Sequence, residues 1–247
     1  MSVPLELHFI GCGDTLGSGG RFQTCFSLRS GETHVLLDCG ASSLVALKRF
    51  EVDPNSIETI FITHLHGDHF GGIPFLVLDT QFSRREAPLT VVGPPGTEQR
   101  VMAAQDILIP GSATAARRFE LRFVELPERV ETVVGAVRVT GFEVVHQSSA
   151  PAYALRLAFG DKVVGYSGDT EWTDALIDAA RDADVFICEA YFYEKVVKNH
   201  LAYTTLRANR DRLGCRRLVL THLNADLLAR RDEVEDECAE DGLRIVI

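Results

Sequence analysis

The sequence predicts an α/β protein in which two β-sheets are flanked by helices. Strand-like apolar segments occur in both halves of the 247 residues, and helical segments lie between them. This alternation is typical of sheets whose faces are covered by helices. Hydrophobic residues make up 46% of the chain, which is enough for a large buried core. We therefore expect one large domain, residues 1–247, rather than two small ones.

Strands and glycine-rich turns open the chain. Turns are expected at 11–14 and 17–20, because glycine adopts the backbone conformations that tight turns need. A short helix is expected to start at Ser42, since serine is a favourable N-cap residue. The strands of this half are predicted at 5–10, 24–28, 34–38, 57–63 and 89–92, and its helices at 42–49, 71–80 and 96–107.

An antiparallel run of strands is expected to begin the second half. Its segments are 119–125, 130–134, 136–146, 153–159 and 162–167. The elements that follow are predicted as helices at 173–181 and 203–212 and as strands at 184–188, 216–221 and 243–247. The acidic stretch 232–241 is predicted to be a helix with a solvated face.

Charge and composition bear on partners and location. The chain carries 35 acidic and 25 basic residues, a formal net charge of −10, and its arginines cluster only in pairs. Duplex nucleic acid would therefore meet net repulsion. The six scattered cysteines, with no Cys-x-x-Cys spacing, fit buried thiols in a reducing compartment. With no apolar run near the ~18 residues of a membrane span and no signal-peptide pattern, we expect a cytoplasmic protein without a membrane partner.

Histidines concentrate in one short segment. Three of the eight histidines, His64, His66 and His69, fall together with Asp68 directly after the strand predicted at 57–63. Imidazole and carboxylate are the usual ligands of zinc-like metals. Gly67 lets the backbone turn sharply, so that two ligands can face one metal and two the next. The alternative is a polar loop with chance histidines.

Three further strands end on a residue that can bind a metal. His146 ends the strand at 137–145, Asp169 follows the strand at 162–166, and His222 follows the strand at 217–221. The carboxyl ends of strands are where sheets of this class place their sites. A lone strand-end histidine is more often a hydrogen-bonded structural group, so these positions carry weight only together with the segment at 64–69.

The complete ligand series resembles the five-motif series of the metallo-β-lactamase superfamily, over nearly the whole chain. The resemblance implies a four-layer αββα sandwich with two mixed sheets and helices outside them. It also implies two divalent metal ions, with zinc as the first choice and manganese or iron as alternatives. By this resemblance the first metal takes His64, His66 and His146, the second takes Asp68, His69 and His222, and Asp169 bridges them.

The surroundings of the ligands are similar to the ribonuclease Z and phosphodiesterase branch. The residues after His146 lack the His-Thr-Pro-Gly-His-Thr context that is usual in β-lactamases and thioesterases, and the opening glycine-rich segment at 11–20 also fits the ribonuclease Z branch. His200, 22 residues before His222, matches a histidine that in this branch helps the leaving group depart. The alternative for His200 is a surface histidine at a helix N-terminus.

One departure from the branch concerns its partner. Ribonuclease Z carries a long flexible arm for tRNA between the third and fourth ligand motifs, whereas only the 22 residues 147–168 stand there in this chain. Two predicted strands and their turn use most of them. We therefore do not expect tRNA to be a partner, and we expect a small-molecule ester or phosphodiester as substrate. A homodimer is what the resemblance suggests.

The predicted function is metal-dependent hydrolysis of phosphodiester bonds by a hydroxide that bridges the two metals. In this prediction Asp68 also orients the hydroxide, and His200 protonates the leaving oxygen or stabilises its developing charge. The alternatives are a hydrolase of carboxylic or sulfate esters, lactones or thioesters, because the ligand set makes the nucleophile and not the specificity, and a non-catalytic metal-binding homologue. A flavin-linked redox branch is the least favoured alternative, because it would need an appended flavin domain that the 247 residues do not provide.

For Asp38 and four aromatic residues, the sequence leaves two interpretations open. Asp38 ends a predicted strand and is either a carboxylate that orients a ligand histidine or an ordinary turn residue. Trp172, Tyr191, Phe192 and Tyr193 stand near ligand-bearing segments and either wall a pocket or belong to the core.

Overall fold

The computed structural model, which describes residues 3–247, contains a first mixed sheet of seven strands in the order β14-β1-β2-β3-β4-β5-β6. Strands β14, β1, β2 and β3 pair antiparallel, and β3 to β6 pair parallel. The strands are β1 (Glu6–Gly11), β2 (Cys25–Ser30), β3 (Thr33–Leu37), β4 (Thr59–Phe61), β5 (Leu89–Gly93), β6 (Leu121–Glu125) and β14 (Arg244–Val246).

The second mixed sheet also has seven strands among the described residues, in the order β13-β12-β11-β10-β9-β8-β7. Here β7 to β10 pair antiparallel and β10 to β13 pair parallel. The strands are β7 (Thr132–Val134), β8 (Val137–Glu143), β9 (Tyr153–Phe159), β10 (Lys162–Tyr166), β11 (Val185–Glu189), β12 (Leu218–Thr221) and β13 (Glu237–Cys238).

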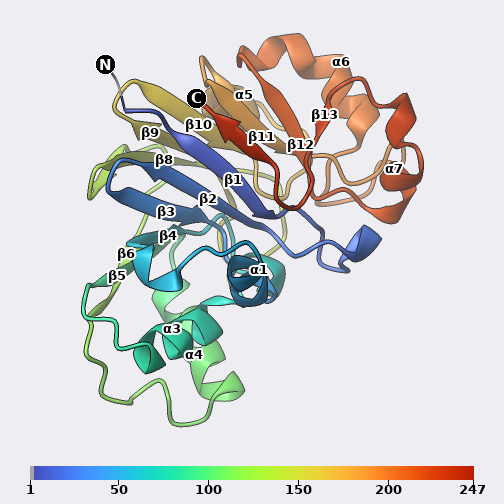
Figure 1. The fold of residues 1–247 in the computed structure, drawn as a ribbon. Coiled ribbons are helices and arrows are strands. Elements are labelled where there is room, and N and C mark those ends of the chain that lie inside the picture. Colours follow the sequence, from blue (N-terminus) through green and yellow to red (C-terminus); the bar gives the residue numbers. More distant parts are fainter. Residues whose placement is uncertain (1–2) are drawn as a thin grey trace.

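Helices cover the outer face of each sheet (Figure 1). Buried side chains of α1, α3 and α4 pack with the first sheet, and those of α5, α6 and α7 pack with the second. The helices are α1 (Ser43–Arg49), α2 (Gly67–Phe70), α3 (Ile73–Phe82), α4 (Thr97–Leu108), α5 (Ala175–Ala180), α6 (Tyr203–Leu213) and α7 (Ala225–Ala229). The order of layers is helix, sheet, sheet, helix, and the predicted αββα fold is confirmed.

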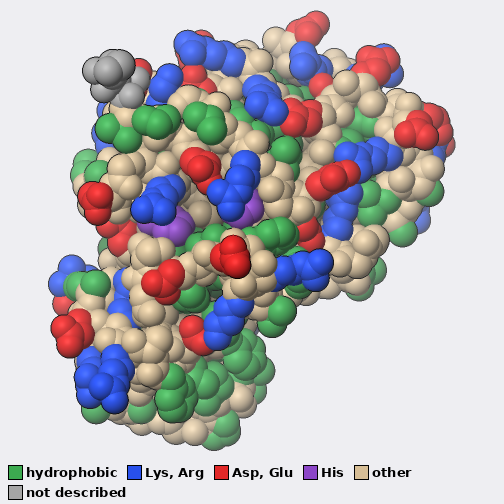
Figure 2. All heavy atoms as spheres, in the orientation of Figure 1, with side chains coloured by type: hydrophobic (Ala, Val, Ile, Leu, Met, Phe, Trp, Pro, Cys, Tyr) green, Lys and Arg blue, Asp and Glu red, His purple; other side chains and the backbone are tan. Residues whose placement is uncertain are grey.

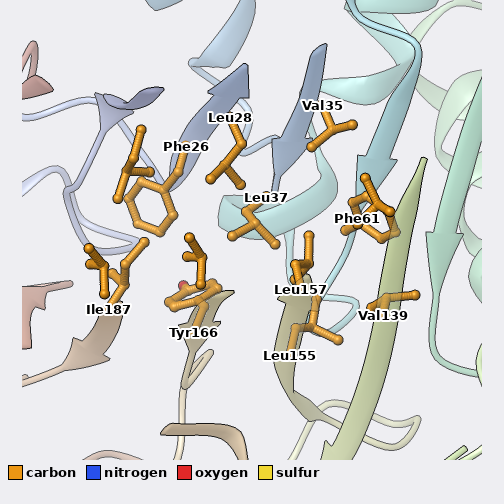
Figure 3. Close-up of a cluster of buried hydrophobic side chains, with 14 of the residues drawn as sticks. Phe26, Leu28, Val35, Leu37, Phe61, Val139, Leu155, Leu157, Tyr166 and Ile187 are labelled. Carbon is orange, nitrogen blue, oxygen red and sulfur yellow. The ribbon is translucent and has the colours of Figure 1, made fainter. Parts of the chain in front are cut away.

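The main core lies between the two sheets (Figure 3). In β3, the side chains of Val35 and Leu37 enter this core, whereas Leu36 between them packs with the helices outside the sheet. This is the two-residue alternation of a strand that is buried on both faces. From the other sheet, Leu155 and Leu157 meet them. The apolar runs in the sequence reflect this burial on both sides.

Two predicted elements differ from the structure. Residues 121–125 do not join the antiparallel run, because β6 pairs parallel with β5 in the first sheet, where the buried Phe119 packs under the helices. The acidic stretch 232–241 is not a helix: it contains β13, which pairs parallel with β12. Cys238 is buried in the outer core of the second sheet and Ala239 in the core between the sheets, and these contacts require extended chain.

On the face shown in Figure 2, side chains of both charge signs are mixed. On the face in view, hydrophobic side chains gather at the lower end, near α3 and α4, and Phe82 and Ile107 of these helices are 80% and 77% exposed. Within residues 3–247, no helix has both the length and the apolar character needed to span a membrane.

Candidate metal centre

The structure brings all seven predicted ligand side chains into one cluster where strands of both sheets end. His64 follows β4 of the first sheet, and α2, which carries Asp68 and His69, comes directly after it. His66, the N-cap residue of α2, lies between His64 and this helix. The remaining three side chains follow strands of the second sheet: His146 after β8, Asp169 after β10 and His222 after β12. In the cluster, two groups have donor atoms within 4.8 Å of one another: His64, His66 and His146 form the first, and Asp68, His69, Asp169 and His222 form the second.

The first group consists of three imidazoles whose nitrogens converge. His66 Nδ1 lies 3.2 Å from His64 Nε2 and 3.0 Å from His146 Nε2. Nitrogens bound to one tetrahedral zinc at about 2.0–2.1 Å would lie about 3.3–3.4 Å apart, which is close to this spacing. Burial lowers the pKa of all three histidines, so each is neutral at pH 7 and keeps a lone pair for a metal.

The second group combines two carboxylates with two imidazoles. His69 Nε2 lies 3.3 Å from Asp169 Oδ1 and 3.4 Å from Asp68 Oδ2. His222 Nε2 lies 3.3 Å from Asp68 Oδ2 and 3.5 Å from Asp169 Oδ2. Asp169 also reaches the first group, because its Oδ2 is 4.0 Å from His64 Nε2. Its carboxylate therefore stands between the two groups.

The charge of the second group favours a bound cation. Burial disfavours protonated His69 and His222, but the neighbouring carboxylates, Asp169 first, outweigh burial; they raise the pKa of His69 and raise that of His222 to about 9. A buried site that draws protons onto its imidazoles attracts divalent cations for the same electrostatic reason. His69 Nε2 and Asp169 Oδ1 are also buried without a hydrogen-bond partner. These orphaned donor atoms fit a metal.

Neighbouring polar groups orient the imidazoles. His69 Nδ1 donates to Asp38 Oδ2 at 2.6 Å, and Asp38 is further held by the backbone N–H and the hydroxyl of Thr63, both at 2.8 Å. His146 Nδ1 donates to the carbonyl of Asn199 at 2.8 Å. These bonds leave Nε2 of each ring for the cluster. Of the two interpretations of Asp38, the structure supports the one in which it orients a histidine, here the predicted ligand His69.

His200 lies beside the second group and not in a helix, since α6 begins at Tyr203. Its Nδ1 donates to Glu189 Oε1 at 2.5 Å and is 4.0 Å from Asp169 Oδ2. Burial lowers the pKa of His200, but the hydrogen bond to Glu189 and the charge of that carboxylate outweigh burial and raise it. The ring stacks on Tyr191 at 4.4 Å, with an interplanar angle of 22°.

Sequence reasoning missed Glu189. This fully buried residue ends β11, and its Oε2 accepts hydrogen bonds from the backbone N–H groups of Thr170 at 2.9 Å and Leu201 at 3.1 Å. With Asp169, His200 and His222 it forms a third group of donor atoms within 4.8 Å. The available signal was the one that identified the ligands: a carboxylate at the end of an apolar strand.

The glycine-rich loop also reaches the site, which its sequence did not predict. Thr15 Oγ1 donates to Asp68 Oδ2 at 2.5 Å, and Gln23 Nε2 donates to the carbonyl of Thr15 at 3.1 Å. Of the four aromatic residues near the predicted ligands, Tyr191 walls the site and Phe192 packs edge to face against it, whereas Trp172 and Tyr193 pack against the outer core of the second sheet.

Comparisons with known proteins agree with this geometry. A family model described as "Anti-Pycsar protein Apyc1" matches residues 5–238. The ribonuclease Z of Geobacillus kaustophilus is 31% identical over 90% of this chain and 89% of its own length. The ribonuclease Z of Agathobacter rectalis is 25% identical over 92% of this chain and 90% of its own length.

Solved structures show the same fold. The metallo-β-lactamase fold protein YhfI from Bacillus subtilis superposes with a TM-score of 0.78 at 21% identity, covering 99% of this chain and 100% of that one. The short form of human tRNase Z gives a TM-score of 0.79 at 22% identity, covering 97% and 98%. A diphosphatase from the PhnP family gives 0.80 at 18% identity, covering 98% and 97%.

These relatives confirm the predicted superfamily, the ribonuclease Z-like branch and a metal-dependent hydrolase, and together with the clustered donors they support binding of divalent metal. The chain belongs to the family described as anti-Pycsar protein Apyc1, among the ribonuclease Z-like, metal-dependent hydrolases of the metallo-β-lactamase superfamily.

Proposed function

We propose that the chain, acting as one domain of residues 1–247, hydrolyses a phosphodiester bond of a small molecule at this centre. The observation that carries the proposal is the placement of the His200–Glu189 pair beside the two donor groups. The three imidazoles of the first donor group and the carboxylates and imidazoles of the second can bind metals. His200 adds a proton donor next to both groups. Cleavage of a phosphodiester needs both, because an alkoxide leaves with a negative charge.

The proposed centre holds two divalent cations, with zinc as the first choice and manganese or iron as alternatives. When bound, the cations supply Lewis-acid stabilisation of the phosphate and activation of water near neutral pH. The proposed ligands of one cation are His64, His66 and His146, those of the other are Asp68, His69 and His222, and Asp169 is shared.

Asp68 has a second proposed role as hydrogen-bond acceptor for the attacking water. Although burial raises the pKa of Asp68, the charge of His69 and the hydrogen bond from His222 outweigh it and hold this pKa below its usual range. The carboxylate is therefore ionised. The hydroxyl of Thr15 donates to its Oδ2 and fixes its orientation.

His200 is the proposed proton donor for the leaving oxygen. Because its Nδ1 is held by Glu189, Nε2 is the nitrogen that remains to meet the substrate. The ring is kept in place by stacking on Tyr191, and its side chain is 23% exposed, so a substrate can reach it.

The similarity to ribonuclease Z makes RNA the alternative substrate class. In the structure, residues 147–168 consist of a short loop and strands β9 and β10, with no further segment inserted among these described residues. The net charge of −10 gives no general attraction to a polyanion. Both observations favour a small phosphodiester over precursor tRNA.

A hydrolysis panel on the metal-reconstituted protein distinguishes phosphodiester hydrolysis from hydrolysis of the other ester classes. The panel consists of bis(4-nitrophenyl) phosphate, 4-nitrophenyl sulfate, a γ-lactone, an acyl thioester and a precursor tRNA. We expect kcat/KM for the phosphodiester to exceed the others by about 10² or more, since both donor groups are arranged for a phosphate. A larger kcat/KM for a lactone, thioester or sulfate ester would move the proposal to that class. No turnover of any substrate by protein of full metal content would favour a non-catalytic homologue.

A further inference from the structure

A cavity of about 550 Å³ lies between α4 and the loop after His146. This volume is within the range of small-molecule sites, about 300–1,000 Å³. The residues that shape it are Leu65, Pro95, Gln99, Arg100, Ser149 and Pro151. None of them belongs to the donor groups of the centre.

The cavity adjoins the first donor group through the chain itself. Leu65, on its wall, stands between the proposed ligands His64 and His66. Ser149, which also lines the cavity, follows the proposed ligand His146 by three residues. Two chain segments that carry proposed ligands therefore also line the cavity.

Leucine and proline side chains form a large part of the walls. Leu65 is only 5% exposed, so its side chain is fixed by packing, and the rings of Pro95 and Pro151 restrict the backbone. Ser149 has a positive φ of 57°, an uncommon conformation for a residue other than glycine. A cavity that is formed in advance costs little ordering entropy when a ligand enters.

One guanidinium is presented to the cavity. Arg100 Nη2 donates to Ser149 Oγ at 2.9 Å, which connects α4 with the loop. Across residues 3–247, this hydroxyl is the one protein group to which the Arg100 side chain donates, so the other guanidinium N–H groups and the face of the guanidinium stay available.

The charge next to the cavity disfavours a second phosphate as the occupant. An adjoining cavity shares Gly96 and Gln99 with this one and is lined by Glu98 and Glu125. Glu125 accepts a hydrogen bond from the backbone N–H of Gly96 at 2.8 Å, which brings its carboxylate to the edge of the space. Two carboxylates beside a single guanidinium repel a further anion. A neutral, planar group fits the apolar walls and the guanidinium face better.

We propose that this cavity is a substrate subsite for an aromatic or heteroaromatic group esterified to the scissile phosphate, and that Arg100 is a specificity-determining residue that contacts this group. The subsite rests on the proposed phosphodiester hydrolysis. Its energy comes from burial of the ring against Leu65 and the prolines, with the guanidinium on the ring face.

Binding tests the subsite without any turnover. Isothermal titration calorimetry on zinc-loaded protein compares phenylphosphonate with methylphosphonate, which carry the same anionic head. We expect phenylphosphonate to bind at least about tenfold more tightly, because burial of one ring is worth more than 1.4 kcal/mol. Ala103 of α4 also lines the cavity, and a tryptophan there would fill it. Arg100→Ala and Ala103→Trp should each reduce this ratio to within about threefold. Arg118→Ala, an exposed arginine elsewhere, should keep it.

Activity gives a second measurement, with bis(4-nitrophenyl) phosphate and methyl 4-nitrophenyl phosphate, which share one leaving group. The wild-type preference in kcat/KM for the diaryl ester should disappear in Arg100→Ala and Ala103→Trp and remain in Arg118→Ala. If neither ester is hydrolysed, the proposed function fails, while the phosphonate ratio still decides the subsite. Equal affinities of the two phosphonates for the wild type, or an unchanged ratio in both cavity variants, would overturn it.

Discussion

The Nδ1–H of His69 donates to Asp38 Oδ2 over 2.6 Å, and both side chains are completely buried. Asp38 adopts a positive φ of 55°, so the chain accepts a strained backbone at this position. The bond fixes which nitrogen of His69 faces Asp68 and Asp169. A carboxylate in this position raises the basicity of the ligand behind it.

Replacing Asp38 should weaken metal binding without removing a ligand. Asp38→Asn keeps the shape but loses the anionic acceptor, and we expect the affinity for one of the two cations to fall by about 10–100-fold. Competition with a chromogenic chelator measures this loss. Asp161→Asn, at an exposed turn, is the control and should bind like the wild type. An unchanged pair of affinities in Asp38→Asn would contradict the orienting role.

His200 should act on the leaving group and not on the metals. His200→Ala is expected to retain both cations and to lower kcat by ~10²–10⁴, the range of general acid catalysis. The loss should shrink for nitrophenolate esters, which need little protonation, and Glu189→Gln should show the same pattern more weakly. The measurements are metal content and kcat over a series of phosphodiesters with graded leaving groups. Loss of metal, or an equal loss of kcat across the series, would remove His200 from this role.

Removal of the proposed cations should lower stability. Asp68 and Asp169 are buried in one group, and a bound cation compensates their charge. Ligand binding at 1,000 times its Kd stabilises a fold by about 4 kcal/mol, so chelation should lower Tm by several degrees. Calorimetry with a chelator, then with zinc added back, measures the change. His64→Ala should respond less to zinc, and an equal response in the two proteins would argue against the first donor group as a site.

Protonation of His34, a histidine outside the donor groups, should lower the free energy of unfolding below pH 6.5. Its Nδ1 donates to Ser56 Oγ at 2.9 Å, its Nε2 accepts from Ser27 Oγ at 2.8 Å, and burial together with Arg29 lowers its pKa to about 4. The unfolded state takes up this proton from about pH 6.5, whereas the folded state does so only near pH 4. This contribution is therefore complete above pH 6.5 and is lost as the pH falls towards 4.

The pH dependence of the free energy of unfolding measures the contribution of His34. Denaturant unfolding between pH 7 and pH 4.5 should lose up to about 1.4 kcal/mol per pH unit from one such histidine. His34→Gln should have a smaller slope than the wild type, and Asp161→Asn should keep the wild-type slope. Identical slopes in wild type and His34→Gln would show that His34 does not cause the loss.

The sequence was most informative where a residue that can bind a metal directly follows a predicted strand. His146, Asp169 and His222 were identified because each follows an apolar strand, and the structure brings them together with the segment at 64–69. Glu189 follows the same rule, but an acidic residue after a strand is also common in ordinary turns. Only its complete burial and its contact with His200 distinguish it.

Long-range packing accounts for what could not be predicted. The contact of Thr15 with Asp68 spans 53 residues and depends on the path of a loop, for which local patterns carry no signal. The same holds for β6, whose apolar pattern fits either sheet and whose partner is chosen by the surrounding core. A local reading also favoured a helix at 232–241, where pairing with β12 prevails.

The donor atoms come from both sheets, and this has a consequence for the kinetics of the protein. With cations bound, the two layers would be cross-linked at one edge by bonds that are reversible but slow to break. Separation of the layers would then require release of metal, so the exchange rate of amide hydrogens in β4 and β12 and the dissociation rate of the cations should share one rate-limiting opening. Metal occupancy would set the lifetime of the native state as well as its chemistry.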